Sequence, residues 1–378
     1  MASSGWIADR AKDIMTTEPN IGPKALQDRL EKKYNVTLRS GRTWEGLQKA
    51  KDDIHGSWEA SFQLLWSFKA EVERSMLGSL VDIDVNAMGE KVFFRRLFVA
   101  LKPCIDGFLL GCRPYLGCDS SFLTGKYTGQ IAAAVGVDGH NWLFPVAYAI
   151  FDKENYENWE WFMQRLKQAV GTRDGLVIHT DACKGLQTAI SDVFGQTVEY
   201  RECFRHLMLN FSKKFRGEVF DSNMWPAAWT FSLYKYQEYM DQIKEACPAA
   251  YEYLEVHHPR AWTRSKFSEA CKIEYVCNNL AESFNAWISD IKGLPIIDLV
   301  NKLKQMIMKQ MSRRKIVAEG LIGKILPSVV RALNAKSRGL NYEIARSGLT
   351  DAEVTVFDMK TKKHNTYGVF LEKWECTC

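Results

Sequence analysis

Two aspartates in apolar surroundings are the residues of this sequence whose placement most clearly suggests chemistry. Asp119 lies within the predicted buried strand LGCDSSF, which starts at Leu116, and Asp181 directly follows the short apolar strand LVIHT. A carboxylate among apolar neighbours is costly unless a cation or a metal ion compensates its charge. Carboxylate oxygens are ligands that suit Mg²⁺ and Mn²⁺. The two aspartates therefore predict a metal-dependent centre, provided that the fold brings them together.

Each aspartate also has an ordinary structural explanation. Asp119 can be paired with a buried cation, and Asp181 can cap the helix predicted to follow it. Two other aspartates, Asp138 and Asp174, each precede a glycine in a predicted turn, and the turn alone accounts for them. Asp119 and Asp181 are therefore stronger candidates than Asp138 and Asp174.

The elements predicted around these aspartates follow a characteristic order. Hydrophobic patterning predicts strands to Phe122, over Gln130–Val137 and over Trp142–Phe151, a helix over Asn155–Val170, the strand before Asp181, a helix over Lys184–Phe194, and a fifth strand near Thr197–Tyr200. This is the order of the ribonuclease H-like fold, in which the first and fourth strands are neighbours. We therefore expect an α/β protein with a mixed five-stranded sheet, and we expect Asp119 and Asp181 to converge as two-metal phosphoryl chemistry requires.

The first 56 residues predict a small helical module. Apolar spacing indicates one helix from Ile21 to Tyr34 and another carrying Trp44, Leu47 and Ile54 on one face, with a turn between them. This arrangement resembles a helix-turn-helix unit with a basic second helix, whose candidate DNA-binding residues are Arg39, Arg42, Lys49 and Lys51. A solvated helical hairpin is the alternative interpretation.

A second basic region lies between residues 292 and 350, where lysines and arginines far outnumber acids and the pattern is helical. It suits a track along DNA phosphates, although a solvated charged face is an alternative. The candidate DNA-binding residues in it are Lys309, Arg313, Arg314 and Lys315.

The remaining boundaries follow from changes in pattern. Residues 57–110 are expected to form a helical connector with an edge strand near Val81–Val85, whereas Phe93–Leu110 suits either a buried helix or a strand followed by a helix. Residues 111–202 would form the first part of the core, 203–272 an all-helical insertion, 273–291 a core helix carrying Glu282, and 351–378 a hairpin that ends in Cys376-Thr377-Cys378.

Composition excludes several classes of protein. With 378 residues, 46% hydrophobic and 25% charged, the chain has the composition of a folded protein, and its net charge of +5 is only mildly basic. No apolar run is long enough to span a bilayer, and no secretory signal is recognisable, so we expect no membrane partner. The ten irregularly spaced cysteines then favour buried thiols or metal ligands over a disulfide framework.

Four separate motifs resemble one known family. The stretches DSSFLTGKYTGQIAAAVGVDGHNWLFPVAYAIF, HTDACKGLQTAI, ECFRHLMLNF and NNLAESFNAWI occur in the order found in the transposase domain of plant Mutator-like elements. The resemblance covers about Leu116 to Ile291. It implies an acidic DDE triad of Asp119, Asp181 and Glu282, of which Glu282 is selected by the last motif alone. It also places the family's Cys-x-x-His signature on Cys203 and His206, for which packing and hydrogen bonding or metal binding are the alternatives.

The C-terminal cysteines carry a further implication of the resemblance. Cys376 and Cys378 look like the first half of a SWIM-type zinc finger, whose pattern continues with another cysteine and a histidine. The sequence stops before those residues, which suggests a truncated finger. Zn²⁺ is therefore expected only if the finger is completed.

The resemblance implies a Mutator-like transposase that cuts and joins DNA strands at transposon ends with two Mg²⁺ or Mn²⁺ ions. Double-stranded DNA, both transposon ends and target, would be its partner, and a homo-oligomer is expected because two ends must be held together. The substrate implies the nucleus. The alternative is a domesticated, transposase-derived transcriptional regulator that binds DNA without transposing it.

Overall fold

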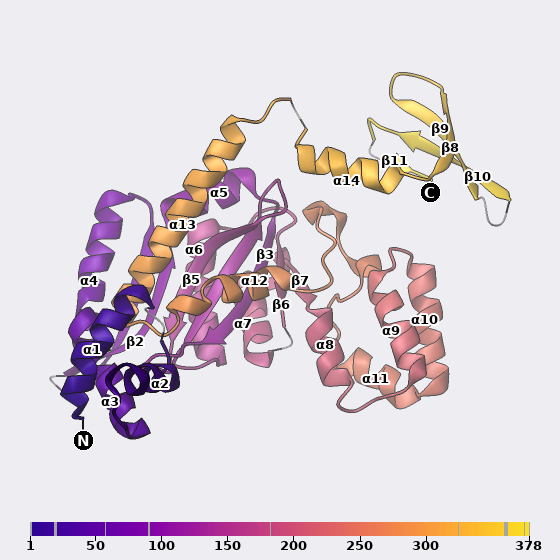
Figure 1. Cartoon of the computed structure of the whole chain (residues 1–378). Helices are drawn as coiled ribbons and strands as arrows, with labels where there is room; N and C mark the ends of the chain where they lie inside the picture. Colours follow the sequence, from indigo (N-terminus) through magenta and orange to yellow (C-terminus); the bar gives the residue numbers. More distant parts are fainter. Residues whose placement is uncertain are drawn as a thin grey trace. The chain divides into compact units, whose positions relative to one another are not determined.

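The computed structural model describes residues 2–18, 21–56, 58–89, 91–181, 183–323, 325–358, 362–373 and 375–377. The chain divides into two compact units, Met1–Ile316 and Val317–Cys378, and each is described by itself. Figure 1 shows the helices and strands that make up both units. Among the described helices, none is both long enough and apolar enough to cross a membrane.

Three helices form the N-terminal part of the first unit: α1 Ser4–Thr17, α2 Pro23–Tyr34 and α3 Ser40–His55. The two predicted helices are confirmed, and α1 is an addition. The face predicted for α3 is wrong in part: Leu47 is buried as predicted, but Trp44 and Ile54 are 55% and 46% exposed. Thr43 and Ala50 are buried beside Leu47, since the close approach of α1 sets which side of α3 faces inward.

The central sheet of the first unit is mixed and has seven strands. They are β1 Leu80–Met88, β2 Lys91–Ala100, β3 Tyr115–Phe122, β4 Gln130–Val137, β5 Leu143–Phe151, β6 Val177–Thr180 and β7 Glu199–Glu202, in the order β1-β2-β5-β4-β3-β6-β7. The pairs β3–β6 and β6–β7 are parallel, and the other neighbouring pairs are antiparallel. The α/β class is therefore confirmed.

The prediction of five strands is wrong, because a hairpin extends the sheet. Strands β1 and β2 pair with each other, and Arg96–Val99 of β2 pair with residues 148–151 of β5. Residues 57–110 are consequently more than a helical connector, since they hold α4 Trp58–Ser75, this hairpin and α5 Lys102–Gly111. The dense apolar run from Phe93 onward is thus a strand followed by a helix, which periodicity alone had left open.

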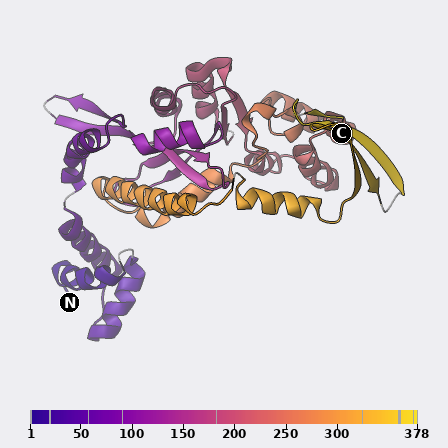
Figure 2. The same cartoon turned by 90° about the horizontal axis from the view of Figure 1, so that it is seen from above.

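Helices cover both faces of the sheet. Helices α5, α6 Tyr156–Val170 and α7 Lys184–Phe194 pack on one face, and α4, α12 Asn279–Trp287 and α13 Ile296–Glu319 pack on the other. Figure 2 shows α13, in orange, along one side of the strands. Alternate residues of each strand serve the two faces: Ala132 and Ala134 contact the first layer, and Ile131, Ala133 and Val135 contact the second.

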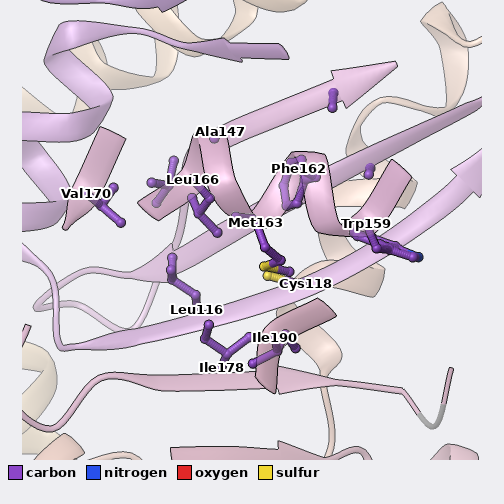
Figure 3. Close-up of a cluster of buried hydrophobic side chains, with 14 of the residues drawn as sticks. Leu116, Cys118, Ala147, Trp159, Phe162, Met163, Leu166, Val170, Ile178 and Ile190 are labelled. Carbon is purple, nitrogen blue, oxygen red and sulfur yellow. The ribbon is translucent and has the colours of Figure 1, made fainter. Parts of the chain in front are cut away.

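Helix α6 shows how the first face is held. Its fully buried Trp159, Phe162 and Leu166 share one apolar cluster with Leu116 and Cys118 of β3, and Met163 lies beside Cys118 (Figure 3). Each such side chain stabilises the fold by about 1.5–3 kcal/mol through removal of apolar surface from water. Asn155 begins the helix, because its side chain accepts a hydrogen bond from the backbone N–H of Asn158 at 2.9 Å. Strand β3 is therefore rigidly backed on the face opposite to α12.

Between β7 and α12 every assigned element is helical. The longer ones are α8 Phe204–Phe211, α9 Glu218–Trp229, α10 Leu233–Ala246 and α11 Pro248–His257, and the short 3₁₀ turns Arg264–Lys266 and Glu269–Cys271 follow them. These helices enclose an apolar core of their own, which includes Phe204, Phe211 and Trp262. Two further 3₁₀ turns, Gly195–Thr197 and Ser289–Ile291, follow α7 and α12.

The second unit contains α14 Pro327–Ser337 and a four-stranded antiparallel sheet. Its strands are β8 Asn341–Arg346, β9 Asp351–Asp358, β10 Lys363–Phe370 and β11 Glu375–Cys376, in the order β11-β10-β9-β8. The predicted C-terminal hairpin corresponds to β9 and β10. The basic segment 292–350, expected to be helical throughout, ends instead in strand β8, whose pairing with β9 overrides the helical pattern.

The approach of α1 to α3 generates a stability prediction. A Cβ at Gly46 would lie 2.5 Å from Cγ2 and 2.6 Å from Cβ of the fully buried Ile7. Gly46→Ala should therefore destabilise the three-helix cluster by about 1–3 kcal/mol through overpacking, despite alanine's higher helix propensity. Hydrogen exchange of the α1 and α3 amides in the full chain measures this loss.

Gly41 provides a matched control in the same helix, because a Cβ there meets nothing within 4 Å. Gly41→Ala should leave exchange unchanged or slow it slightly. Equal behaviour of the two variants would contradict the packing described for Gly46 and Ile7.

Candidate active site

The parallel pairing of β3 and β6 brings the two predicted aspartates together. Gly117 of β3 is in register with His179 of β6. Continuing this register by two residues sets Asp119 beside Asp181, just beyond the end of β6. Side chains alternate along a strand, so Asp119 points to the sheet face covered by α12, whereas its neighbour Cys118 belongs to the opposite core. The two aspartates are therefore near each other, and their role as a metal centre stays a prediction.

Asp119 is largely enclosed and held by two donors. Its Oδ1 accepts a hydrogen bond from the backbone N–H of Ser120 at 2.8 Å, and its Oδ2 accepts one from Nδ2 of Asn285 at 2.9 Å. Burial, and then the nearby charge of Asp181, raise the pKa of Asp119 to about 7. The carboxyl is thus positioned, but its charge is not compensated by these contacts.

Asp181 lies in a similar environment. Burial raises its pKa to about 6, with a further contribution from the charge of Glu154. Its Oδ1 is buried and has no hydrogen-bond partner. The nearby His206 lowers the pKa of Asp181 but does not offset its burial, so ionisation of this carboxylate remains costly. Two hard oxygen ligands with raised pKa values, one with an unsatisfied oxygen, fit a divalent cation such as Mg²⁺ or Mn²⁺.

Glu282, the third predicted acid, lies in the first turn of α12. Its Oε2 accepts a hydrogen bond from Nη1 of Arg205 on α8 at 2.5 Å, and both side chains are partly exposed. Among the residues that the structure describes, no three His, Cys, Asp or Glu side chains are arranged to hold a metal ion. The structure therefore brings two of the acids together and shows the third in an ion pair. The assignment of Glu282 stays a prediction.

Helix α12 is anchored on β3 by asparagines that sequence reasoning missed. Asn278, just before the helix, donates from Nδ2 to the backbone oxygen of Cys118 at 3.0 Å. Gly117 permits this approach, because a Cβ there would lie 2.4 Å from Oδ1 of Asn278. One turn and two turns further on are Glu282 and Asn285, on the same side of the helix. The spacing of these polar residues within NNLAESFNAWI indicates that all three share one side of the helix, but the sequence prediction used it only for Glu282.

Cys203 and His206 lie next to the two aspartates. Cys203 is fully buried at the start of α8, and its backbone N–H donates to the oxygen of Thr180 at 2.7 Å. Its Sγ accepts the backbone N–H of Asn278 at 3.3 Å. Hydrogen bonds from Cys277 and then His206 lower the pKa of Cys203, and the bond to Cys203 raises the pKa of His206 to about 9. These contacts link β6, α8 and the start of α12, and the role of the pair stays a prediction.

The basic residues predicted to contact DNA differ in their surroundings. Arg39 and Arg42 are exposed, whereas Lys49 donates to Oγ of Ser4 at 3.0 Å and burial lowers the pKa of Lys51. On α13, Lys309, Arg313 and Lys315 are exposed. Arg314 is mostly buried and pairs with Asp138 at 3.3 Å. A structural role thus accounts for Arg314, and the contribution of all these residues to DNA binding stays a prediction.

The C-terminal cysteines add little to the site. Cys376 lies in β11, and Cys378 lies outside the described residues. The zinc finger stays a prediction.

Two comparisons with known proteins bear on this geometry. Residues 115–210 match the family model of the MULE transposase domain, a stretch that contains Asp119, Asp181, Cys203 and His206 but ends before Glu282. The chain is also similar to Protein FAR1-RELATED SEQUENCE 6 of Arabidopsis thaliana, with 29% identity over 139 residues. That alignment covers 36% of this chain and 18% of the relative, so the chain matches less than a fifth of that protein's length. Residues 115–210 thus match the MULE transposase domain, and part of the chain is similar to a FAR1-related plant protein.

Proposed function

We propose that this protein is a DDE-type DNA transposase of the Mutator-like class, which cleaves and transfers DNA strands at transposon ends. The observation that carries the proposal is the proximity of Asp119, within β3, to Asp181, just beyond the end of β6, in the segment that matches the MULE transposase domain. These two largely buried carboxylates keep raised pKa values although His206 is a nearby positive charge, so His206 offsets their burial only in part. They have the chemistry of ligands for catalytic divalent ions.

The proposed core is ribonuclease H-like. Supporting this, the strands from β3 to β7 lie in the order β5-β4-β3-β6-β7, with the first three antiparallel and the last two added in parallel. Strands β1 and β2 would then be an extension at the β5 edge, and the helices between 204 and 257 an insertion before the core helix α12.

In this proposal Asp119 and Asp181 hold Mg²⁺ or Mn²⁺, and Glu282 completes the ligand set. When bound, such ions activate an attacking oxygen and stabilise the leaving oxygen of a phosphodiester. The chain's own part is to fix the two aspartates on adjacent strands and to orient Glu282 through Arg205. Zn²⁺ would bind only in a completed C-terminal finger that begins with Cys376 and Cys378.

The partner would be double-stranded DNA. Exposed basic residues of α3 and α13 are suited to phosphate contacts, and the exposed Lys309 and Arg313 line a hollow of about 310 Å³ beside Trp287. A homo-oligomer would hold two transposon ends together, and a protein with this substrate would act in the nucleus.

One observation favours a second function, a DNA-binding transcriptional regulator without transposition activity. Glu282 is engaged by Arg205, and the described residues include no cluster of three acids arranged for a metal ion. A domain of this kind could retain its fold and its basic surfaces after strand cleavage was lost. DNA binding without cleavage would identify this alternative.

The proposal predicts loss of cleavage when Asp181 is neutralised. Asp181→Asn keeps the size of the side chain but removes its charge. Nicking of DNA with candidate element ends in Mg²⁺ or Mn²⁺ should therefore fall about 100-fold or more, because losing a direct metal ligand costs more than losing an outer-shell partner. Asp174→Asn, at an exposed turn, is the matched control and should cut normally. If the natural protein and both variants bind the ends but none of them cuts the DNA, the proposed enzymatic activity is wrong.

The raised pKa of Asp181 predicts a pH-dependent stability. In the unfolded chain the carboxyl ionises near its ordinary pKa, but in the folded protein it ionises only at about 6, so folding stability falls as the pH rises between these values. Asp181→Asn removes this loss and should stabilise the metal-free protein at about pH 8 by up to 2–3 kcal/mol, and far less at about pH 4.

Thermal unfolding across this pH range measures the effect. Mn²⁺ should raise the melting temperature of the natural protein at about pH 8 and should do much less for Asp181→Asn, since the cation stabilises the ionised carboxylate. A variant whose stability follows that of the natural protein at every pH would show that Asp181 is not buried as described.

A further inference from the structure

Asn285 connects the helix of one predicted acid to the carboxylate of another. It lies on α12, one turn after Glu282, and its Nδ2 donates to Oδ2 of Asp119 at 2.9 Å. The orientation of its amide follows from its partners. An ionised carboxylate only accepts hydrogen bonds, so the NH₂ group must face Asp119 and the oxygen must face away.

The amide oxygen of Asn285 is held in turn. It accepts a hydrogen bond from the hydroxyl of Ser121 at 2.8 Å. Ser121 lies two residues after Asp119 on β3 and therefore on the same face of the sheet. Ser121, Asn285 and Asp119 thus form a closed chain of contacts between β3 and α12.

We propose that Asn285 is a positioning residue for the metal centre: its amide fixes the Asp119 carboxylate in the orientation that binds a divalent cation, and Ser121 fixes the amide. The inference rests on the proposed function and deepens it. Hydrogen bonds to an outer shell of residues commonly set the orientation of metal ligands.

The chemistry of an amide suits this task. Each carboxylate oxygen has two lone pairs, so Asp119 can accept from Ser120 and Asn285 and still offer a lone pair of either oxygen to a cation. A lysine or arginine at position 285 would instead neutralise Asp119 and compete with the metal. A neutral donor orients the ligand while leaving its charge available.

A purely structural role accounts less well for these contacts. Helix α12 is already anchored by the buried side chains of Ala281, Phe284 and Ile288 just beyond its end, and by Asn278 at its start. Asn285 is only partly buried. Its two polar contacts are therefore not needed to dock the helix, and both are directed to the immediate neighbourhood of Asp119.

The inference can be tested without relying on cleavage, by measuring how tightly the full chain binds Mn²⁺. Calorimetry and the electron paramagnetic resonance signal of free Mn²⁺ both report this affinity. Asn285→Ala should weaken Mn²⁺ binding about 10- to 100-fold, the usual cost of losing an outer-shell partner. Asn279→Ala is the matched control, because Asn279 is exposed on the same helix, and it should bind Mn²⁺ as the natural protein does.

A double-mutant cycle separates positioning from general damage. Ser121→Ala alone should weaken Mn²⁺ binding several-fold, but adding it to Asn285→Ala should cost nothing more, because Ser121 acts only through the amide. Circular dichroism establishes that each variant is folded. If Asn285→Ala does not fold, Ser121→Ala alone tests the proposal. Normal Mn²⁺ affinity of Ser121→Ala would contradict the proposed chain of hydrogen bonds.

The outcomes distinguish the inference from the function on which it rests. If the natural protein binds Mn²⁺ and a folded Asn285→Ala variant binds it equally well, the positioning role is wrong and the metal centre stands. If the two substitutions weaken binding independently, the chain through the amide is wrong. If the natural protein binds no Mn²⁺, the proposed metal-dependent function falls and the inference falls with it.

Discussion

The parallel pairing of β3 with β6 is the constraint on which the rest of the site depends. Its register sets Asp119 beside Asp181, and no local sequence feature could achieve this, because the two residues are separated by two strands and a helix. The apolar contacts of α6 hold β3 from one side and α12 closes it from the other. Apolar packing in the rest of the core thus offsets the free-energy cost of holding two carboxylates that repel each other.

The second half of the site is assembled through polar contacts at the start of α12. Asn278 bonds to β3 through the oxygen of Cys118 and also to Sγ of Cys203, while Arg205, two residues after Cys203, holds Glu282. The Cys-x-x-His segment therefore links the helices after β7 to the helix that carries the third predicted acid.

Sequence patterns predicted the strands of the core well, because their apolar runs are short, dense and bounded by turns, as in Gln130–Val137. They failed where tertiary contacts decide. Trp44 looks like a core residue but is exposed, since Gly46 and Ile7 determine which face of α3 turns inward. The β1–β2 hairpin was missed as a pair, because only β1 alternates clearly. Asn278 and Asn285 were missed because a polar residue on a helix is usually solvated, and only the distance to β3 gives them a role.

The central claim is that Asp119 and Asp181 together form a divalent-metal centre. Anomalous diffraction from crystals grown with Mn²⁺ tests it most directly, because it locates the ion without any assumption about activity. The account predicts an anomalous peak in contact with the carboxylates of both Asp119 and Asp181. Manganese bound elsewhere, with both carboxylates free of it, would contradict the account.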